Sequence, residues 1–427
     1  MDATGSPVTY DTVVIGAGLA GLTAALRLTE AGQRVLVVAK GVGATHLAPA
    51  TIDVLGYVHG PVESPARALP AFVAENAQHP YRNVPIEQLR ASLDWFKARL
   101  GDHGYRGDLE ENILLPTAVG VAKPTALVPE TMAAGDLRAG GRFVFVGFRG
   151  LKDFHPAYLA ENLARASLPT GTSVAARALE LAPPVDGRGD VSTVELARRF
   201  EQAGFRESVL GELARRLVPG EVVGFPAVLG LAHAREVRHE LEASLGHRVF
   251  EVPTLPPSVQ GIRLYESMTA AVRRGGGRLV IGSAVTGAAS RGERIDSVAA
   301  QTAARPLTYR AHSFLLATGG LASGGILLDS SREAREAVFG LPLACVPAPE
   351  QARFEPGYFD HHALSRVGVG VDERFRPVDA EGAPAYENLY AAGATIAGAV
   401  PWQEASGNGV SLATGYAAAT AILESAP

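Results

Sequence analysis

Three glycines near the N-terminus have the spacing of a phosphate-binding turn. Gly16, Gly18 and Gly21 form the pattern G-x-G-x-x-G within "TVVIGAGLAGLTAAL". In such a turn the first glycine permits the tight bend, the second lets the backbone approach a pyrophosphate, and the third lets helix pack on strand. The free N–H groups at the start of the next helix favour a negatively charged group. The pattern predicts a dinucleotide site; the alternative is a glycine-rich turn without a ligand.

The acidic residue that usually accompanies this turn is missing. About 20 residues further on, at the end of the second strand, a carboxylate normally binds the adenosine ribose. The sequence reads Val38, Ala39 and Lys40 at that point. Either the adenosine is held differently, with Lys40 as a candidate contact, or the ligand is a mononucleotide flavin. The residues alone leave this choice between FAD and FMN open.

Two stretches in the second half of the chain favour a flavin over a nicotinamide cofactor. Residues 313–325 form an apolar strand that ends in Ala-Thr-Gly-Gly, and the small residues there let the backbone lie close to a cofactor. Thr318 and Gly319 are the candidate contacts. A second strand, "NLYAAG", ends at Gly393, which we also assign to the cofactor site.

A third stretch, "ASGNGVSLATGYAAATAILESA", reads as a glycine-rich loop that opens a helix running nearly to the C-terminus. Asn408 is expected to cap this helix. With Gly409 and Val410 it forms a candidate cofactor contact. The positive end of the helix can stabilise negative charge at the pyrimidine end of a reduced flavin.

The elements that must position these residues follow an α/β pattern. The turn lies between the apolar strand "TVVIG" and the helix "LTAALRLTEAG", and "RVLVVA" is a second buried strand. The region from 61 to 249 alternates between strands and helices, which indicates a second α/β element. In this order the segments resemble the flavoprotein oxidoreductases of the fumarate reductase type, in which a cap interrupts one FAD domain. We therefore expect a Rossmann-like flavin-binding domain with a parallel sheet, residues 1–60 and 250–427, interrupted by an α/β cap, residues 61–249.

The composition restricts the class of protein. The chain has 427 residues, of which 47% are hydrophobic and 19% charged, as in a well-buried globular protein. A net charge of −5 gives no basic field, so a nucleic-acid partner is not expected. A single cysteine, Cys345, builds no zinc or iron–sulfur site and fits a reducing, cytosolic setting. No signal peptide is recognised, and no apolar run approaches the ~18 residues that span a bilayer.

Four stretches carry a more specific resemblance. They are "GATHLAPATIDVL" (43–55), "VGFRGLKDF" (146–154), "GFPAVLGL" (224–231) and "VPTLPPSVQGIRL" (252–264). In this order the chain resembles, nearly end to end, the B subunits of the anaerobic glycerol-3-phosphate dehydrogenases. The last stretch is the most distinctive, because the cofactor motifs are shared with a much larger superfamily.

The resemblance implies a function in anaerobic respiration on glycerol. The complex of that family oxidises sn-glycerol 3-phosphate to dihydroxyacetone phosphate and sends electrons to quinone. Its A subunit carries FAD, its B subunit is described as an FMN protein, and its C subunit carries iron–sulfur centres and ties the pair to the membrane. We therefore expect FMN, with FAD as the alternative, and a cytoplasmic protein held at the inner face of the cell membrane by a partner.

The resemblance also places His46, in "THLAPATIDVLGY", beside the flavin ring. It could hydrogen-bond the ring or be a point of covalent attachment. The plain alternative is a buried histidine bonded to Asp53 or to backbone. Asp53 itself is interpreted as a helix or turn cap.

The other catalytic candidates are Arg263, His361 and His362. Arg263 could bind phosphate or polarise a substrate oxygen, or it could instead pin the cap to the cofactor domain. A general base for alcohol oxidation is most often a histidine, which is why the adjacent His361 and His362 are named. Lys123 lies either in the cleft or on the solvated surface. No metal ligands are predicted.

Two further interpretations remain. The chain could be a non-catalytic electron-transfer or structural flavin subunit of the same complex, with the oxidation done by the A subunit. It could also be a stand-alone enzyme like fumarate reductase or ketosteroid dehydrogenase, against which the 252–264 stretch argues.

Overall fold

The chain forms two compact units, each made of separate segments. The computed structural model describes residues 9–182, 190–303, 305–331, 333–348 and 351–425. The first unit comprises residues 1–44, 68–96 and 267–427. The second unit comprises residues 45–67 and 97–266. Three helices run across these limits: α2 (Pro65–Glu75), α3 (Ile86–Arg99) and α9 (Val259–Arg274).

The first unit is built on a mixed sheet with the order β11-β2-β1-β14-β13-β12, and β19 also pairs with β14. Its strands are β1 (Thr9–Ile15), β2 (Val35–Ala39), β11 (Arg278–Ile281), β12 (Ala284–Arg291), β13 (Arg294–Gln301), β14 (Leu307–Leu316) and β19 (Leu389–Ala391). Short strand pairs are formed by β15 (Ile326–Leu328) with β16 (Ala334–Glu336) and by β17 (Leu343–Ala344) with β18 (Gly368–Val369). The remaining helices are α1 (Leu19–Glu30), α10 (Pro401–Glu404) and α11 (Gly407–Ser425).

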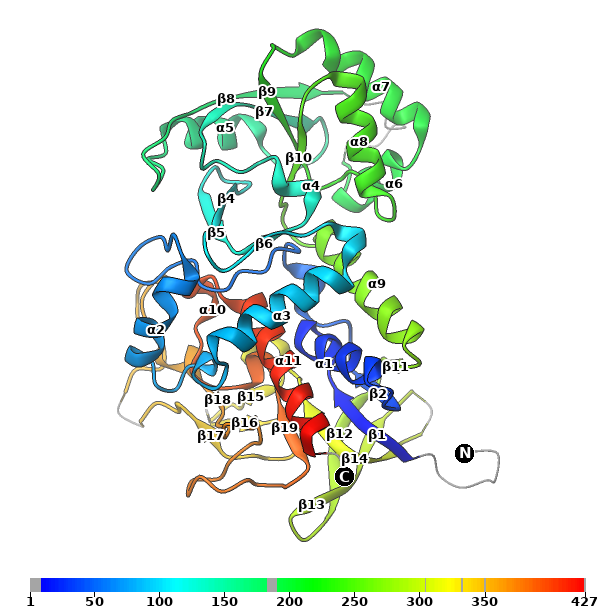
Figure 1. Ribbon diagram of the computed structural model, residues 1–427, viewed down its shortest axis with the longest axis vertical. Coiled ribbons are helices and arrows are strands. Elements are labelled where there is room, and N and C mark those ends of the chain that lie inside the picture. The colour runs from blue at the N-terminus through cyan, green and yellow to red at the C-terminus, as the bar shows by residue number, and fades with distance from the viewer. Residues whose placement is uncertain (1–8, 183–189, 304, 332, 349–350, 426–427) are drawn as a thin grey trace. The chain divides into compact units, whose positions relative to one another are not determined.

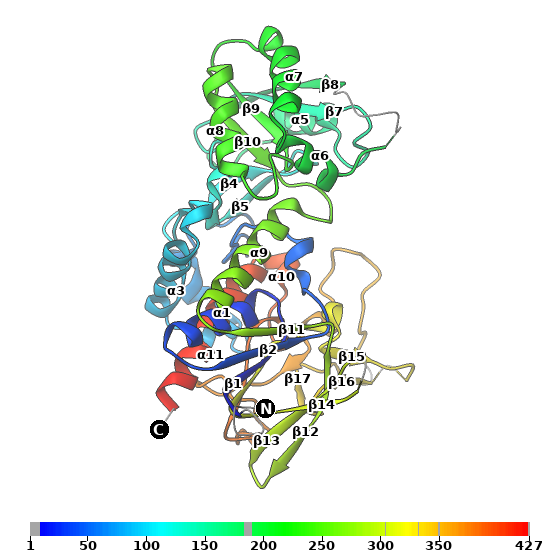
Figure 2. The ribbon, with the colours of Figure 1, turned by 90° about the vertical axis from the view of Figure 1, so that its right-hand side faces the viewer.

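The five strands β11, β2, β1, β14 and β19 run parallel, as expected for a nucleotide-binding sheet. Every residue of β2 is buried, which explains its continuous apolar run "VLVVA". The helices α1 and α11 lie side by side (Figures 1 and 2). A Cβ on Gly415 of α11 would come within 2.5 Å of the Ala20 carbonyl oxygen of α1. Small residues therefore let these two helices pack closely.

The hairpin of β12 and β13 makes the sheet mixed, because both strands run antiparallel to their neighbours. β13 pairs with the first half of β14, and β19 pairs with its last residues, Phe314–Leu316. The hairpin follows β11 directly, so no helix connects it. The predicted parallel sheet is therefore present, with an antiparallel extension that the sequence pattern did not indicate.

The second unit contains a four-stranded sheet of order β10-β9-β7-β8, parallel throughout. Its strands are β7 (Gly141–Phe148), β8 (Val174–Leu181), β9 (Glu221–Pro226) and β10 (Val249–Val252). Its helices are α4 (Glu130–Ala133), α5 (Pro156–Arg165), α6 (Thr193–Phe200), α7 (Ala203–Leu213) and α8 (Ala234–Leu245). The short strands are β3 (Arg106–Gly107), β4 (Ile113–Pro116), β5 (Ala122–Thr125) and β6 (Leu127–Val128). Because helices connect successive parallel strands, this unit confirms the predicted second α/β element.

Buried aromatic rings form much of the second unit's core. Phe200 packs edge-on against both Phe205 and Phe225, with ring centroids 5.2 and 6.0 Å apart. Phe250 of β10 makes similar contacts with Phe143 and Phe145 of β7. Edge-to-face pairs of this kind add to the free energy gained from burying the rings.

The limits of the compact units do not coincide with the predicted domain boundaries at 60/61 and 249/250. Residues 68–96 belong to the first unit, where the Trp95 indole N–H donates to Glu30 at 2.9 Å. Residues 45–60 and 250–266 belong to the second unit. The assignment of flavin binding to one domain and of a cap role to the other stays a prediction.

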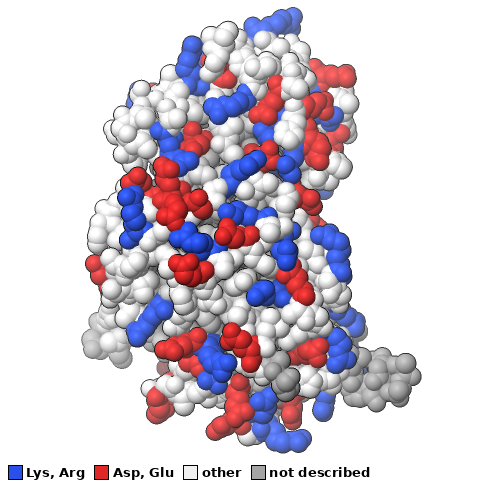
Figure 3. Space-filling view, viewed as in Figure 1, with Lys and Arg blue, Asp and Glu red and all other residues white. Residues whose placement is uncertain are grey.

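Charged side chains of both signs lie on the surface. On the face drawn in Figure 3, Lys and Arg side chains are interspersed with Asp and Glu side chains. Within the part of the chain that the structure describes, no helix is both long and apolar enough to cross a bilayer.

Candidate functional site

The predicted cofactor residues of the first unit gather at one edge of its sheet. Ile15, at the end of β1, is paired with Val38 of β2 and with Leu316 of β14. Leu316 is paired in turn with Ala391 of β19. Since these strands are parallel, the turns that follow them lie at the same edge, where open α/β sheets bind ligands.

The three glycines of the fingerprint have three different surroundings. Gly16 has φ of 121°, and a Cβ on it would collide with the carbonyl oxygen of Ala317. A Cβ on Gly21 would collide with the Gly16 carbonyl oxygen. Gly18 differs, because no heavy atom lies within 4 Å of the position that its Cβ would take. Gly16 and Gly21 are therefore required by the fold, whereas Gly18 leaves an open approach to the backbone.

The start of α1 is suited to an anion. Its N-cap residue is Gly18, which has no side chain, and the first turn carries no acidic residue. The first N–H groups of a helix have no partner within the helix, and the helix dipole adds positive potential there. Lys40, which follows β2, is exposed. The position of the missing acid is thus occupied by an exposed lysine, whose contact with the cofactor stays a prediction.

The small residues that follow β14 and β19 are also in contact with this edge. Gly393 has φ of 77°, and a Cβ there would come within 2.8 Å of Ala20 Cβ in α1. The Gly393 N–H donates to Thr414 Oγ1 of α11 at 2.8 Å. Thr318 and Gly319 follow β14, and the Gly319 carbonyl accepts a hydrogen bond from Thr395 Oγ1 at 3.1 Å. Gly393 is therefore required for the close approach of α1 and α11 to the end of β19.

The prediction that Asn408 caps the last helix is wrong, because the helix begins before this residue. α11 begins at Gly407, so Asn408 lies inside its first turn, together with the buried Gly409 and Val410. The residue before the helix is Ser406, whose carbonyl accepts the Val410 N–H at 2.8 Å. The loop "ASGN" looked like a capping sequence because asparagine is a good cap, but the chain turns into the helix earlier.

His46 and Asp53 lie in the second unit. His46 is in a short 3₁₀ turn, Ala44–Leu47, and its ring meets the Tyr265 ring edge-on at 4.7 Å. Its Nε2 atom is buried and has no hydrogen-bond partner. Burial lowers the pKa of His46, although the Glu266 carboxylate acts in the opposite direction. Asp53 neither caps a helix nor bonds His46, because its Oδ2 is paired with Lys123 Nζ at 2.5 Å.

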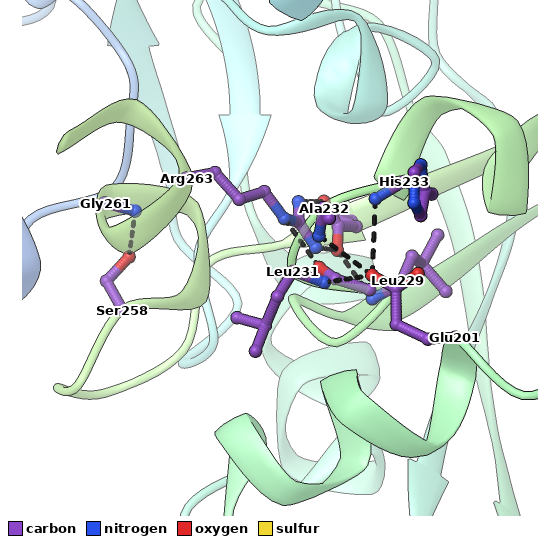
Figure 4. Close-up of polar contacts among 10 residues, drawn as sticks. Glu201, Leu229, Leu231, Ala232, His233, Ser258, Gly261 and Arg263 are labelled. Carbon is purple, nitrogen blue, oxygen red and sulfur yellow. Dashed lines mark hydrogen bonds and ion pairs between the residues drawn. The ribbon is translucent and has the colours of Figure 1, made fainter. Parts of the chain in front are cut away.

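Each of the three nitrogens of the Arg263 guanidinium donates a hydrogen bond within the protein (Figure 4). Its Nη1 and Nη2 donate to the Glu251 carboxylate at 2.6 and 2.9 Å, and its Nε donates to the Gly230 carbonyl at 2.7 Å. Glu251 Oε1 also accepts the Leu229 N–H at 2.9 Å. Arg263 therefore joins α9, β10 and the 229–230 turn within the second unit. This geometry leaves no support for the predicted contact with a substrate phosphate.

The loop 229–233, which contacts Arg263, is held by a second carboxylate. Glu201 Oε1 accepts the N–H groups of Leu231 and Ala232 at 2.7 and 2.8 Å, and that of His233 at 3.3 Å. These hydrogen bonds lower the pKa of Glu201 although burial acts to raise it. The stretch "GFPAVLGL" thus begins in β9 and ends in a turn that is held by two glutamates.

The adjacent histidines have local roles. His362 Nδ1 accepts the Glu355 N–H at 3.0 Å, and its Nε2 lies 3.0 Å from the Tyr358 carbonyl oxygen, to which it donates. Both ring nitrogens are thus used to fold the 355–362 loop, which does not support a role as general base. His361 is exposed.

Sequence reasoning missed a buried pair in the first unit. His79 Nε2 lies 3.3 Å from Glu404 Oε2, and both side chains are almost completely buried. The two residues are 325 positions apart, so no local pattern indicates the contact. Among the described residues, no group of three or more His, Cys, Asp or Glu side chains could hold a metal ion.

Comparison with known proteins shows the family of the chain. The family model of the FAD binding domain matches residues 11–410. This match and the relatives below identify a flavoprotein of the oxidoreductase class. A protein of Halobacterium salinarum, named as the probable B subunit of an anaerobic glycerol-3-phosphate dehydrogenase, is 35% identical over 429 residues, covering 97% of this chain and 98% of that protein. The B subunit of the enzyme of the same name from Vibrio cholerae serotype O1 is 30% identical over 430 residues, covering 97% and 96%. The chain belongs to the family of B subunits of the anaerobic glycerol-3-phosphate dehydrogenases.

A solved structure is a more distant match. The 3-ketosteroid delta1-dehydrogenase from Sterolibacterium denitrificans shares 12% sequence identity, with a TM-score of 0.46 and coverage of 98% of this chain and 100% of that one. This likeness is too slight to bear on function. The family model is that of an FAD binding domain, so it supports a flavin cofactor and gives no support to FMN as the first choice.

Proposed function

We propose that this chain is the catalytic B subunit of a quinone-linked anaerobic sn-glycerol-3-phosphate dehydrogenase. It oxidises glycerol 3-phosphate to dihydroxyacetone phosphate and passes the electrons on through an iron–sulfur subunit. The names of the relatives support the substrate and the assembly. The observation that carries the proposal is the open approach to Gly18 at the start of α1, between two glycines that the fold requires.

The cofactor we propose is FAD. An open backbone beside an uncapped helix start fits a pyrophosphate, which FAD has and FMN lacks. The bound flavin would supply a two-electron acceptor for the alcohol carbon. The residues that we assign to it are Gly16, Gly18, Gly21, Lys40, Thr318, Gly319, Gly393, Asn408, Gly409 and Val410.

For the proton of the oxidised hydroxyl we propose His46 as the acceptor. Its buried Nε2 has no partner, and burial lowers its pKa, so the ring is neutral near pH 7. A neutral imidazole has a lone pair available for the proton, as general-base catalysis requires. Arg263 and His362 are not retained as catalytic residues, because Arg263 is bonded to Glu251 and Gly230 and His362 is bonded within its own loop. His361, which is exposed, stays a second candidate for the general base.

A partner surface is proposed on the first unit. Phe354, Tyr358, Phe359 and Trp402 have 47–81% of their surface exposed, and the rings of the last three lie within 6.5 Å of one another. Exposed aromatic clusters of this kind mark protein interfaces. The described part of the 351–362 loop carries one arginine and two carboxylates, which disfavours an anionic lipid surface. We assign this aromatic patch to another member of the complex.

One finding favours the second candidate, a non-catalytic flavin subunit. The arginine that the sequence suggested for the substrate phosphate donates from all three of its nitrogens to Glu251 and Gly230. In that case the oxidation belongs to the partner, and this chain only relays electrons.

The two candidates are separated by an anaerobic titration. The purified, flavin-loaded chain is mixed with glycerol 3-phosphate, and the flavin absorbance is followed. The catalytic proposal predicts bleaching by glycerol 3-phosphate in the isolated chain. Bleaching by dithionite alone would favour the relay role, and bleaching by a ketosteroid or oxidation of the reduced flavin by fumarate would favour a stand-alone enzyme.

A further inference from the structure

The stretch "TLPPSVQGIRL" contains a glutamine whose side chain the fold does not explain. Ser258 caps α9, since its Oγ accepts the Gly261 N–H at 3.0 Å. Gly261 allows a close approach, and Arg263 makes the buried ion pair with Glu251. Gln260 lies between them, is 1% exposed, and has no hydrogen-bond partner for either atom of its side-chain amide.

Other unpartnered polar atoms lie in two segments of the second unit, residues 45–53 and 254–260. Thr45 is 7% exposed and its Oγ1 has no partner. The same holds for His46 Nε2, for Thr254 Oγ1 and for Asp53 Oδ1, whose other carboxylate oxygen is bound by Lys123. We call these residues, with Gln260, the polar junction.

The two segments of the polar junction are in direct contact. The Ser258 N–H donates to the His46 carbonyl at 2.8 Å. A Cβ on Gly261 would collide with the Thr45 carbonyl oxygen and lie 2.5 Å from that of Ala48. The start of α9 is thus packed against residues 45–48, which brings the backbones that carry Thr45, His46 and Gln260 together.

Five residues with unpartnered buried atoms on these two segments need a cause. A buried donor or acceptor without a partner costs about 1–3 kcal/mol, and native proteins keep few of them. A bound molecule that supplies the missing hydrogen bonds removes that cost. The concentration of these groups on two touching segments therefore indicates a binding site.

The chemistry of the groups indicates what binds. The carboxamide of Gln260 offers both donors and an acceptor, a threonine hydroxyl does the same, and a neutral imidazole offers one of each. Hydroxyl groups both donate and accept, so they match this set. A phosphate or carboxylate only accepts, and it would leave the Gln260 carbonyl and the Asp53 oxygen unpaired.

We propose that the polar junction binds the hydroxyl groups of a small polyol and that Gln260 is a main determinant of its affinity. The inference rests on the proposed function, in which the polyol is the glycerol part of glycerol 3-phosphate. It assigns the phosphate to other residues and gives the 252–264 stretch a second role beside its structural one.

The test compares two variants of the full, flavin-loaded chain. Gln260→Leu removes the amide while keeping a similar volume, and Gln301→Leu makes the same change at an exposed position of β13. Binding of glycerol 3-phosphate, of glycerol and of inorganic phosphate is measured by calorimetry. Flavin content and the thermal midpoint without substrate are measured for each protein.

The proposal predicts that Gln260→Leu weakens glycerol 3-phosphate and glycerol at least about tenfold, which corresponds to ~1.4 kcal/mol. Its flavin content equals that of the wild type, and its midpoint without substrate is not lower, because an unpaired polar group has been replaced by an apolar one. Gln301→Leu binds as the wild type does.

Three results would overturn the proposal. Unchanged affinity in Gln260→Leu would mean that water satisfies the amide. Loss of flavin in this variant would mean that the flavin occupies the junction. A wild-type chain that binds neither glycerol nor glycerol 3-phosphate would contradict both the inference and the proposed substrate. A chain that binds glycerol alone would contradict only the proposed substrate.

Discussion

His79 donates a hydrogen bond from Nε2 to the Glu404 carboxylate at 3.3 Å, while its Nδ1 accepts the Tyr81 N–H at 3.1 Å. The same carboxylate accepts the Val400 N–H and the Ser406 hydroxyl, both at 2.7 Å. It therefore closes the segment 400–406, which leads directly into α11. The pair fixes the start of the helix that we assign to the flavin.

Glu404→Gln should loosen this segment. The change keeps the shape but removes the negative charge that three donors share, and hydrogen bonds to charged groups contribute ~1.5–3 kcal/mol each. Denaturant unfolding is expected to show a loss of about 2 kcal/mol and the flavin affinity to fall. Glu373→Gln, at an exposed position, is the control. An equally stable Glu404→Gln would contradict the assigned role.

The same pair predicts a response to acid. Burial raises the pKa of Glu404, but the hydrogen bonds from His79, Ser406 and Val400 prevail and hold it below the ordinary 4.5. A depressed carboxyl pKa stabilises the fold above the unfolded value, and this contribution is lost as the pH falls below 4.5. Unfolding of the wild type between pH 5 and pH 3 should therefore depend more steeply on pH than that of Glu404→Gln.

The glycines of the turn should separate folding from cofactor binding. Gly16→Ala places a Cβ against the Ala317 carbonyl, at a residue whose φ is 121°. Both the stability and the flavin content should therefore fall. Gly18→Ala meets no protein atom, so the thermal midpoint should stay near that of the wild type. Its flavin affinity should nevertheless fall at least about tenfold, because the methyl group occupies the approach of the pyrophosphate. Full flavin occupancy in Gly18→Ala would place the pyrophosphate elsewhere.

The pair of Arg263 and Glu251 should behave as a structural unit. Arg263→Met leaves the Glu251 carboxylate, which is 1% exposed, without its partner. Breaking a buried ion pair in this way costs ~3–5 kcal/mol, whereas replacing both partners by apolar residues is often neutral. A double-mutant cycle with Glu251→Met should therefore restore much of the stability. If Arg263→Met instead raised the KM for glycerol 3-phosphate and left stability unchanged, Arg263 would be a substrate ligand after all.

His103 should make the fold sensitive to mild acid. Burial, aided by the charges of Arg263 and Arg235, lowers its pKa from 6.5 to about 4. The unfolded chain therefore binds a proton between pH 6.5 and pH 4 that the folded chain does not bind. Its contribution to stability is complete above pH 6.5 and falls by at most about 1.4 kcal/mol per pH unit below it.

Chemical unfolding of His103→Gln at pH 7 and pH 5 checks this sensitivity. The variant should lose less stability between the two pH values than the wild type does. His155→Gln, at an exposed position, should keep the wild-type slope. Equal slopes for His103→Gln and the wild type would show that His103 is protonated in the folded chain at pH 5.

The sequence predicted those features that depend on neighbouring residues. The apolar runs of β1 and β2, the helix α1 and the glycine turn are local patterns, and the structure has all of them. The alternation of strands and helices likewise predicted the α/β character of the second unit. The incorrect cap at Asn408 lies two residues after Ser406, the residue that precedes the helix.

Features that depend on distant partners were not predicted. From the sequence alone, the Arg263 guanidinium could bind either a phosphate or a carboxylate. The packing of α9 on β10 places it against the Glu251 carboxylate. His79 contacts Glu404 across 325 positions, which no periodicity reveals. The pairing of residues 68–96 with the first unit follows from the same kind of long-range contact, such as that of Trp95 with Glu30.

The most direct test of the account is the identity of the cofactor. The wild-type chain is purified, the flavin is released with acid, and its mass and its amount per chain are determined. The account predicts FAD, about one per chain, because the open backbone at Gly18 and the start of α1 are built for a pyrophosphate. FMN would contradict it, and so would a chain that binds no flavin even when FAD is added.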